Sequence, residues 1–158
     1  IVNMGKGVTG ISAEAFRGCD ALTSITIPGG VTGIENNLLR DCSSLVTANI
    51  GSGVIGIGQS AFRGCVSLSN ISIPVSVVTI AQYAFDGTSN LTDVYYSGSQ
   101  TQWNTITIEG NNTKLTSASI HYNSPSEISI AVTGISLNKS VLSLSAGSSE
   151  KLTAIISP

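Results

Sequence analysis

The sequence predicts a mostly β solenoid of the α/β class, in which short strands, turns and short helical turns repeat along the chain. The first observation is a period of 23 residues over most of the 158-residue chain. Five registers keep this interval, and the leucine register consists of Leu22, Leu45, Leu68 and Leu91. The second observation is that one unit buries too few apolar side chains to fold alone, so the units must stack.

The units follow one another without a gap. Residues 1–21 form the back part of a unit, and full copies occupy residues 22–44, 45–67 and 68–90. Residues 91–114 begin as a fourth copy and then change, and residues 115–122 repeat the opening strand. Solenoid ends need caps. We therefore interpret the altered segment 91–122, with Trp103, as the C-terminal cap of a repeat domain at residues 1–122.

Each unit combines a strand, a break, a second apolar patch and a short helical turn. In the second unit, Ile25 and Ile27 alternate with polar residues, so both should face the core. Pro28 then ends the strand, and Val31 and Ile34 return to the core. Residues 12–16 and 59–62 suit one helical turn that buries an aromatic side chain.

The period stops after residue 122. Residues 123–131 are mostly polar and contain Pro125, so we interpret them as a linker. Residues 132–158 alternate at period two in three short runs, which indicates the first strands of a β-sandwich. A complete sandwich needs about 100 residues, so this segment is expected to be a partial one.

Composition excludes two classes of partner. The formal net charge is −2, from seven basic and nine acidic residues. A nucleic-acid-binding protein would need a basic stripe to neutralise phosphates. No apolar run approaches the roughly 18 residues of a membrane span, so we expect neither nucleic-acid binding nor membrane insertion of this segment.

Two glycine motifs resemble nucleotide-binding loops. Residues 5–10 and 51–56 both match G-x-G-x-x-G, which in a dinucleotide-binding fold holds pyrophosphate at the start of a helix. The two motifs lie 46 residues apart, or two repeats, and no long helix follows either one. We interpret them as turn glycines and expect no cofactor.

Three cysteines occupy one register: Cys19, Cys42 and Cys65. They should form a row with a spacing of about 5 Å, whereas structural zinc needs four converging ligands. A disulfide between neighbours would leave one thiol over. Buried core positions are the expected role, and no metal site is expected.

His121 is the only imidazole, so any Ser–His or Cys–His catalytic site must use it. Ser119 alternates with His121 and should face the same side. Aligning residues 115–122 with residues 91–96 pairs Asp93 with Ser117, about 13 Å from His121. A triad requires hydrogen-bond reach between its members, so we expect no catalytic residues.

The outward face of the strands is the remaining candidate surface. Small uncharged residues dominate its N-terminal part, and aromatic and ionisable ones gather at the other end. Tyr and Trp are enriched in binding hot spots. The predicted partner-binding residues are Asp93, Tyr95, Trp103, Ser119 and His121. The alternative is a solvated sheet face with a capping Trp.

These units resemble the BspA-like, spirochaete-type leucine-rich repeat of bacterial surface proteins. The matching pattern is L-x-x-I-x-I-P-x-x-V-x-x-I-x-x-x-A-F-x-x-C, and residues 1–122 carry five or six copies. Departures include Asn36–Leu39 in place of x-x-A-F, Ala48 for Ile and Thr88 for Cys. Residues 132–158 are similar to the start of a group 2 bacterial Ig-like domain.

The resemblance implies a leucine-rich-repeat solenoid in a secreted or cell-surface protein that takes part in adhesion. The expected partner is a host or bacterial surface or matrix protein, bound non-catalytically through the repeat face with avidity. Two alternatives stay open, a structural spacer within a larger surface protein and a glycan-binding module at the end with Tyr95 and Trp103.

Overall fold

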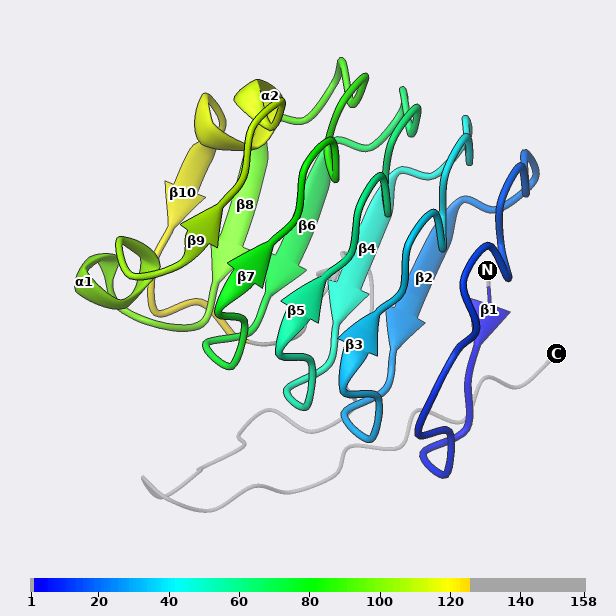
Figure 1. Ribbon diagram of the computed structural model, residues 1–158, viewed down its shortest axis with the longest axis horizontal. Coiled ribbons are helices and arrows are strands. Elements are labelled where there is room, and N and C mark those ends of the chain that lie inside the picture. Colours follow the sequence, from blue (N-terminus) through cyan, green and yellow to red (C-terminus); the bar gives the residue numbers. More distant parts are fainter. Residues whose placement is uncertain (1, 126–158) are drawn as a thin grey trace, which may run out of the picture.

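The computed structural model describes residues 2–125, which wind into successive coils of a solenoid (Figure 1). One strand from each coil contributes to a six-stranded parallel sheet in the order β1-β2-β4-β6-β8-β10. Its strands are β1 (Val2–Asn3), β2 (Ser24–Ile27), β4 (Thr47–Ile50), β6 (Asn70–Ile73), β8 (Asp93–Tyr96) and β10 (Ser119–His121). The predicted mostly β solenoid is confirmed for these residues.

The second apolar patch of each unit forms a further sheet, which the sequence analysis did not predict. This four-stranded parallel sheet has the order β3-β5-β7-β9. Its strands are β3 (Gly33–Ile34), β5 (Gly56–Ile57), β7 (Thr79–Ile80) and β9 (Thr107–Ile108). Two residues are too few to show alternation, so the pattern indicated only a return of the chain to the core.

The 23-residue period sets the register of the central strands. Ser24 pairs with Thr47, and Thr47 pairs with Asn70, so equivalent residues of neighbouring coils stand side by side. Ile25 and Ile27 are each 1% exposed, and Thr26 between them is exposed. The predicted inward and outward faces of the strand are therefore confirmed.

The predicted helical turn in each unit is wrong, because this corner is a series of tight turns. The second residue of each corner has a positive φ of 55–63°, which a right-handed helix does not allow; these residues are Glu14, Asn37, Ser60 and Tyr83. Alternate amides then point along the solenoid axis instead of back into the same turn. The Phe62 amide donates to the Ala84 carbonyl of the next coil at 2.8 Å, while the Arg63 amide donates to Ser60 within its own turn.

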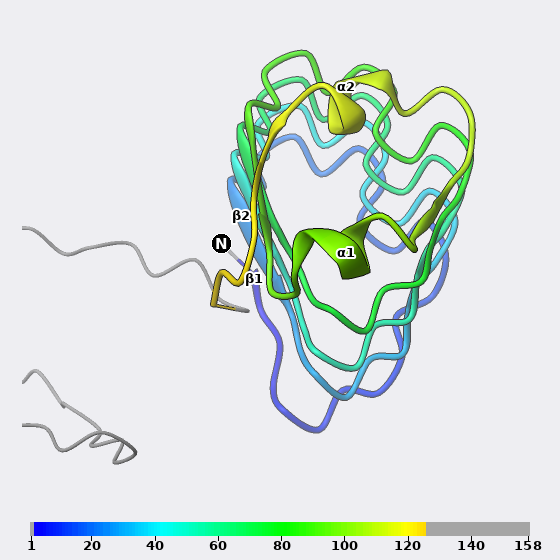
Figure 2. The same ribbon diagram turned by 90° about the vertical axis from the view of Figure 1, so that its left-hand side faces the viewer.

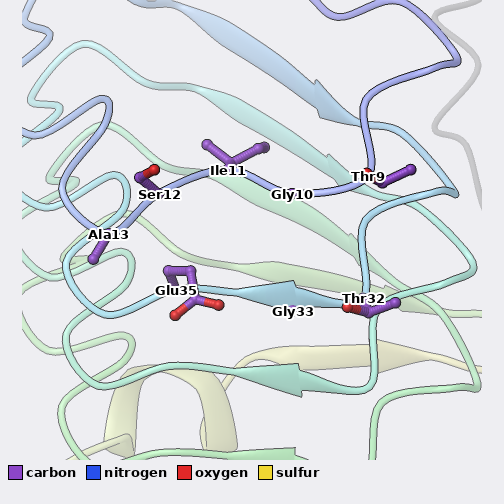
Figure 3. A pocket seen from close by; sticks show the side chains of 8 residues that line it. All are labelled: Thr9, Gly10, Ile11, Ser12, Ala13, Thr32, Gly33 and Glu35. Carbon is purple, nitrogen blue, oxygen red and sulfur yellow. The ribbon is translucent and has the colours of Figure 1, made fainter.

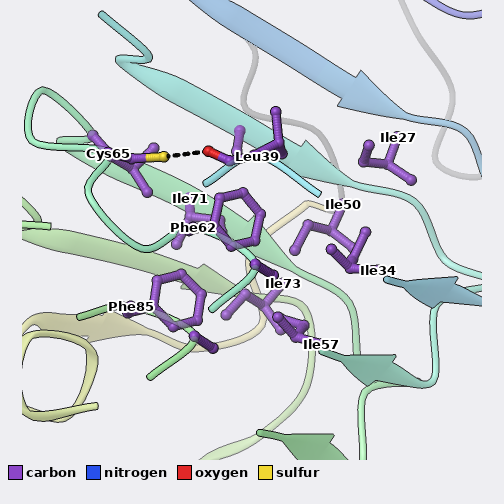
Figure 4. Close-up of a cluster of buried hydrophobic side chains, with 14 of the residues drawn as sticks. Ile27, Ile34, Leu39, Ile50, Ile57, Phe62, Cys65, Ile71, Ile73 and Phe85 are labelled. Carbon is purple, nitrogen blue, oxygen red and sulfur yellow. Dashed lines mark hydrogen bonds between the residues drawn. The ribbon is translucent and has the colours of Figure 1, made fainter. Parts of the chain in front are cut away.

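The core is one continuous column of side chains between the two sheets and the corner (Figure 4). Leu39, Phe62 and Phe85 are fully buried in it, and the half-buried Phe16 packs against the same cluster. The rings of Phe62 and Phe85 stack with centroids 5.2 Å apart and planes 9° apart. Equivalent residues of successive coils therefore form one shared column.

The last coil departs from the period. Ile80 pairs with Ile108, 28 residues later, and Asp93 pairs with Ser119, 26 residues later. The additional residues form helix α1 (Gln100–Trp103) and helix α2 (Thr113–Thr116). Seen along the axis, α1 lies across the opening between the two sheets (Figure 2). Trp103 meets buried Tyr96 edge-on, with centroids 5.1 Å apart.

Asn112 completes this cap. Its Oδ1 accepts the Phe85 amide at 2.9 Å, which takes the place of the carbonyl that the next regular coil would supply. Its Nδ2 donates to the carbonyls of Ala81 and Glu109, both at 2.9 Å. The side chain is 3% exposed, so it satisfies backbone groups that water cannot reach.

The remaining predictions fall on other parts of the chain. Most of the linker at residues 123–131 and the whole Ig-like segment at residues 132–158 lie outside the described residues, so both stay predictions. Neither α1 nor α2, the helices found in residues 2–125, has the length and apolar character needed to cross a bilayer.

Candidate functional site

The solvent-facing side of the six-stranded sheet, called the outer face here, carries two columns of side chains across neighbouring coils. The first column runs through Ser24, Thr47, Asn70, Asp93 and Ser119. The second runs through Thr26, Asn49, Ser72, Tyr95 and His121, and within it Ser72 is fully buried. Ionisable or aromatic residues enter the columns at β8 and β10, with Asp93 in the first column and Tyr95 and His121 in the second.

Tyr95 and His121 are direct neighbours in the second column. Their rings stack with centroids 4.8 Å apart and planes 15° apart. This distance matches the spacing of adjacent strands, about 4.8 Å, because register pairing places both side chains side by side on the same face. Each ring covers one face of the other, so the pair offers a partner its edges and its outermost faces.

Asp93 reaches across the strands to the same imidazole. Its Oδ1 lies 2.7 Å from His121 Nε2, and its Oδ2 accepts the Thr92 hydroxyl at 2.7 Å. The predicted separation of about 13 Å is wrong, because Asp93 pairs with Ser119 and not with Ser117. The sequence placed the opening of the last strand at Leu115, but this residue belongs to helix α2 (Thr113–Thr116). The strand therefore begins four residues later, at Ser119.

The observed pairing of β8 with β10 is shifted by two residues from the predicted alignment. This shift leaves the predicted faces unchanged, because side chains alternate with a period of two. Ser119 and His121 therefore face outward as predicted, whereas Ser117 is the C-cap of α2. The signal that could have placed the strand is the apolar alternation of Ala118, Ile120 and Tyr122, all half-buried against the core. It aligns Ile120 with buried Val94.

The contact with His121 also changes the acid–base behaviour of Asp93. Hydrogen bonds from His121 and then from Thr92 lower the pKa of the Asp93 carboxyl below its ordinary value. Both side chains remain accessible, with relative exposures of 36% for Asp93 and 45% for His121. A carboxylate and an imidazole fixed on an exposed strand end can both bond a polar partner.

The predicted site residues therefore divide into two groups. Asp93, Tyr95, Ser119 and His121 lie together at the C-terminal end of the outer face; this group is called the β8–β10 cluster. Trp103 does not join them. It packs against Tyr96, whose side chain points into the core from the opposite side of β8.

The cluster has two of the three parts of a hydrolytic triad. The carboxylate of Asp93 holds one imidazole nitrogen of His121. Within residues 2–125, no hydrogen bond joins a hydroxyl or thiol to the other ring nitrogen, and the Ser124 hydroxyl donates to the His121 backbone carbonyl instead. The observed geometry fixes the orientation of the imidazole through the Asp93 carboxylate.

The second glycine motif and the two buried cysteines have structural roles. A Cβ on Gly53 would lie 2.1 Å from the Gly29 carbonyl oxygen, so this turn needs glycine for close approach of two coils. Cys42 and Cys65 are buried, and the Cys65 thiol donates to the Leu39 carbonyl at 3.1 Å (Figure 4). The contact with Cys42 together with burial raises the pKa of Cys65. In the described part of the chain, no group of three potential ligands could hold a metal ion.

Comparisons with known proteins give the same architecture. A family model described as "BspA type Leucine rich repeat region (6 copies)" matches residues 2–114. The crystal structure of a leucine rich cell surface protein from Faecalibacterium prausnitzii A2-165 is similar, with a TM-score of 0.57 and 29% identity over 66% of this chain and 34% of that chain.

The leucine rich repeat protein of T. pallidum is also similar, with a TM-score of 0.54 and 32% identity over 56% of this chain and 41% of that chain. The chain thus spans about a third to two fifths of the length of these solved proteins. No curated protein matches it.

Proposed function

Because the chain belongs to the BspA-type leucine-rich repeat family, we propose that it is a non-catalytic interaction module of a secreted or cell-surface protein. The similar protein from Faecalibacterium prausnitzii is described as a cell surface protein, which supports this location. Parallel strands in strict register give the solenoid a regular outer face on which partner-binding side chains can be displayed.

The β8–β10 cluster is the proposed contact site, and the observation that carries the proposal is its arrangement in space. Stacked Tyr95 and His121 beside the Asp93 carboxylate combine aromatic surface, a hydrogen-bond donor and a negative charge on one strand end. Interface hot spots are enriched in aromatic residues. The rest of the outer face carries mainly Ser, Thr and Asn, and its exposed members such as Thr26 can add hydrogen bonds, whereas Ser72 beside Tyr95 is buried.

The partner we propose is a surface or matrix protein of a host or of another bacterium, bound weakly by each copy. Six strands at a spacing of about 4.8 Å give a face of roughly 250 Å². A standard interface buries about 800 Å² on each partner. Useful adhesion therefore requires several copies or a longer repeat array, through avidity.

Two alternatives predict different behaviour. A structural spacer would bind nothing through the outer face. A glycan-binding module would use the aromatic residues, but Tyr95 and Trp103 lie on different sides of β8 and form no common platform. The stacked Tyr95 and His121 also cover part of each other, so protein binding through ring edges fits the geometry better.

The test is a binding screen of the chain displayed on a tetrameric scaffold, against matrix proteins and a glycan array. For a protein ligand found in the screen, Tyr95→Ala and His121→Ala should each weaken monovalent binding by about tenfold or more, as expected for hot-spot residues. Thr26→Ala is the matched control, since Thr26 lies in the same column at the other end of the face.

Circular dichroism and the unfolding midpoint would show that the variants keep the fold. Equal binding by the Tyr95, His121 and Thr26 variants would contradict the β8–β10 cluster as the site. Binding to glycans alone would support the glycan module, and no binding to either array would favour the spacer.

A further inference from the structure

The first and second coils separate on the side of the second sheet. The resulting opening, called the slot here, has a volume of about 460 Å³ (Figure 3). Its walls are the segments 9–13 and 32–35, and the lining residues are Thr9, Gly10, Ile11, Ser12, Ala13, Thr32, Gly33 and Glu35. Binding pockets for small ligands occupy about 300–1,000 Å³, so the slot is large enough for one.

Backbone hydrogen bonds that join all later coils are missing at the slot. The Ile55 amide donates to the Thr32 carbonyl at 2.9 Å, and the Gly58 amide donates to the Ile34 carbonyl at 2.7 Å. The corresponding amides of the second coil, on Thr32 and Glu35, have no such partner among residues 2–125, and β3 is the edge of its sheet. One wall therefore offers two amide donors, and the other offers the Thr9 and Ile11 carbonyls.

The slot is closed at both ends by contacts between the same two coils. On one side, the Glu14 amide donates to the Asn36 carbonyl at 3.2 Å. On the other side, a Cβ on Gly30 would lie only 2.9 Å from the Val8 carbonyl oxygen. The slot is therefore a local gap between the first and second coils, which contact each other on both sides of it.

The slot also has a defined charge. Glu35 is exposed beside it, and its carboxylate forms no ion pair with any cation in the described part of the chain. Gly10 leaves the centre open, since a Cβ built there would meet no atom within 4 Å. Half-buried Ile11 contributes an apolar surface from the core.

We infer that the slot binds a short extended peptide segment that carries a Lys or Arg side chain. The peptide backbone accepts hydrogen bonds from the Thr32 and Glu35 amides and adds a strand to the edge of β3, a known mode of peptide recognition. The basic side chain pairs with the Glu35 carboxylate. The coils of β4 and β6 lie between this site and the β8–β10 cluster, and the inference does not depend on the proposed function.

The test is an NMR titration of the ¹⁵N-labelled chain with the capped tripeptide acetyl-Val-Lys-Val-amide. We expect shift changes centred on the amides of Thr32, Gly33 and Glu35, and faster hydrogen exchange of the Thr32 and Glu35 amides than of Ile55 and Gly58 before peptide is added. Exchange as slow as at Ile55 would show that the slot is closed and would overturn the inference.

Three comparisons make the test specific. Glu35→Gln should weaken binding by up to about fivefold, the effect of losing one exposed ion pair. Gly10→Val should abolish binding by filling the slot, whereas Gly7→Val, where a Cβ also meets open space, should leave binding unchanged. The inference would be overturned if acetyl-Val-Glu-Val-amide bound as well as the Lys peptide, or if the Gly10→Val variant kept full binding. Chemical-shift changes induced by sugars and not by the peptide would also overturn it.

Discussion

The regular coils at residues 22–90 and the cap coil at residues 91–122 are built on different principles. In the regular coils the strand pairing and the backbone hydrogen bonds between coils repeat from coil to coil, so one pattern of residues sets the whole arrangement. In the cap the interval lengthens to 28 and then 26 residues. Individual side chains, Asn112 and Trp103 among them, replace the contacts that another coil would provide.

The difference explains where unusual chemistry can arise. A residue in a regular coil is surrounded by its own equivalents, so the outer face there repeats similar small polar side chains. The shifted register of the cap places unlike residues beside one another, which brings His121 next to both Tyr95 and Asp93. The candidate contact site therefore lies at the junction of the two regions.

The largest expected effect is a loss of core packing in the regular region. Phe62→Ala should lower the free energy of unfolding by about 3–5 kcal/mol, because the fully buried ring stacks on Phe85 and leaves a cavity. Phe16→Ala is the matched control in the first coil. That ring is half-buried, so the expected loss is about 1–2 kcal/mol. Urea denaturation measures both, and equal losses would contradict a core that is tightest in the central coils.

The second effect concerns the cap. Asn112→Ala should cost about 2–3 kcal/mol, because it leaves the buried Phe85 amide without its partner and removes a donor from the Ala81 and Glu109 carbonyls. Hydrogen exchange should accelerate first at Phe85, the residue next to the cap. Asn90→Ala, at an exposed turn position, should change stability by less than about 0.5 kcal/mol. If the two variants behaved alike, Asn112 would not be the terminating residue.

The sequence alone was sufficient for features that depend on periodicity. The long strands, their faces and the shared aromatic column follow from Leu22, Ile25 and Phe62 and their equivalents at a fixed interval. The tight corner was missed because positive φ at Glu14, Asn37, Ser60 and Tyr83 leaves no common residue type. The sixth residue of each corner also has a positive φ, and there glycine does mark the turn in three coils, at Gly18, Gly64 and Gly87.

The candidate site shows the same division. The outward direction of Tyr95 and His121 was predictable from alternation, since it survives a shift of two residues. Their contact with Asp93 was not, because it depends on the length of the cap and on α2. Trp103 lies in the last, altered coil, and only the structure shows that it packs on the side of Tyr96.

The smallest predicted effect tests the register of β10 in solution. The pKa of Asp93 is lowered from its ordinary value of 3.8 by the hydrogen bonds from His121 and Thr92. A lowered carboxyl pKa adds stability above the ordinary value, and this contribution is lost as the pH falls through the pKa of the folded state. Asp93→Asn should therefore be less stable than the natural chain at pH 5–6, by at most about 1 kcal/mol for such an exposed pair.

The stability difference between Asp93→Asn and the natural chain should shrink as the pH is lowered below 3.8, and also in 0.5 M salt. Urea denaturation at a series of pH values and at both salt concentrations measures these changes. His121→Ala should reproduce most of this loss at pH 5–6, because it removes the first partner of Asp93. A stability difference that grows toward acid would contradict the contact. The result decides the register, since Asp93 reaches His121 with the 26-residue interval and would lie about 13 Å away with the 24-residue alignment.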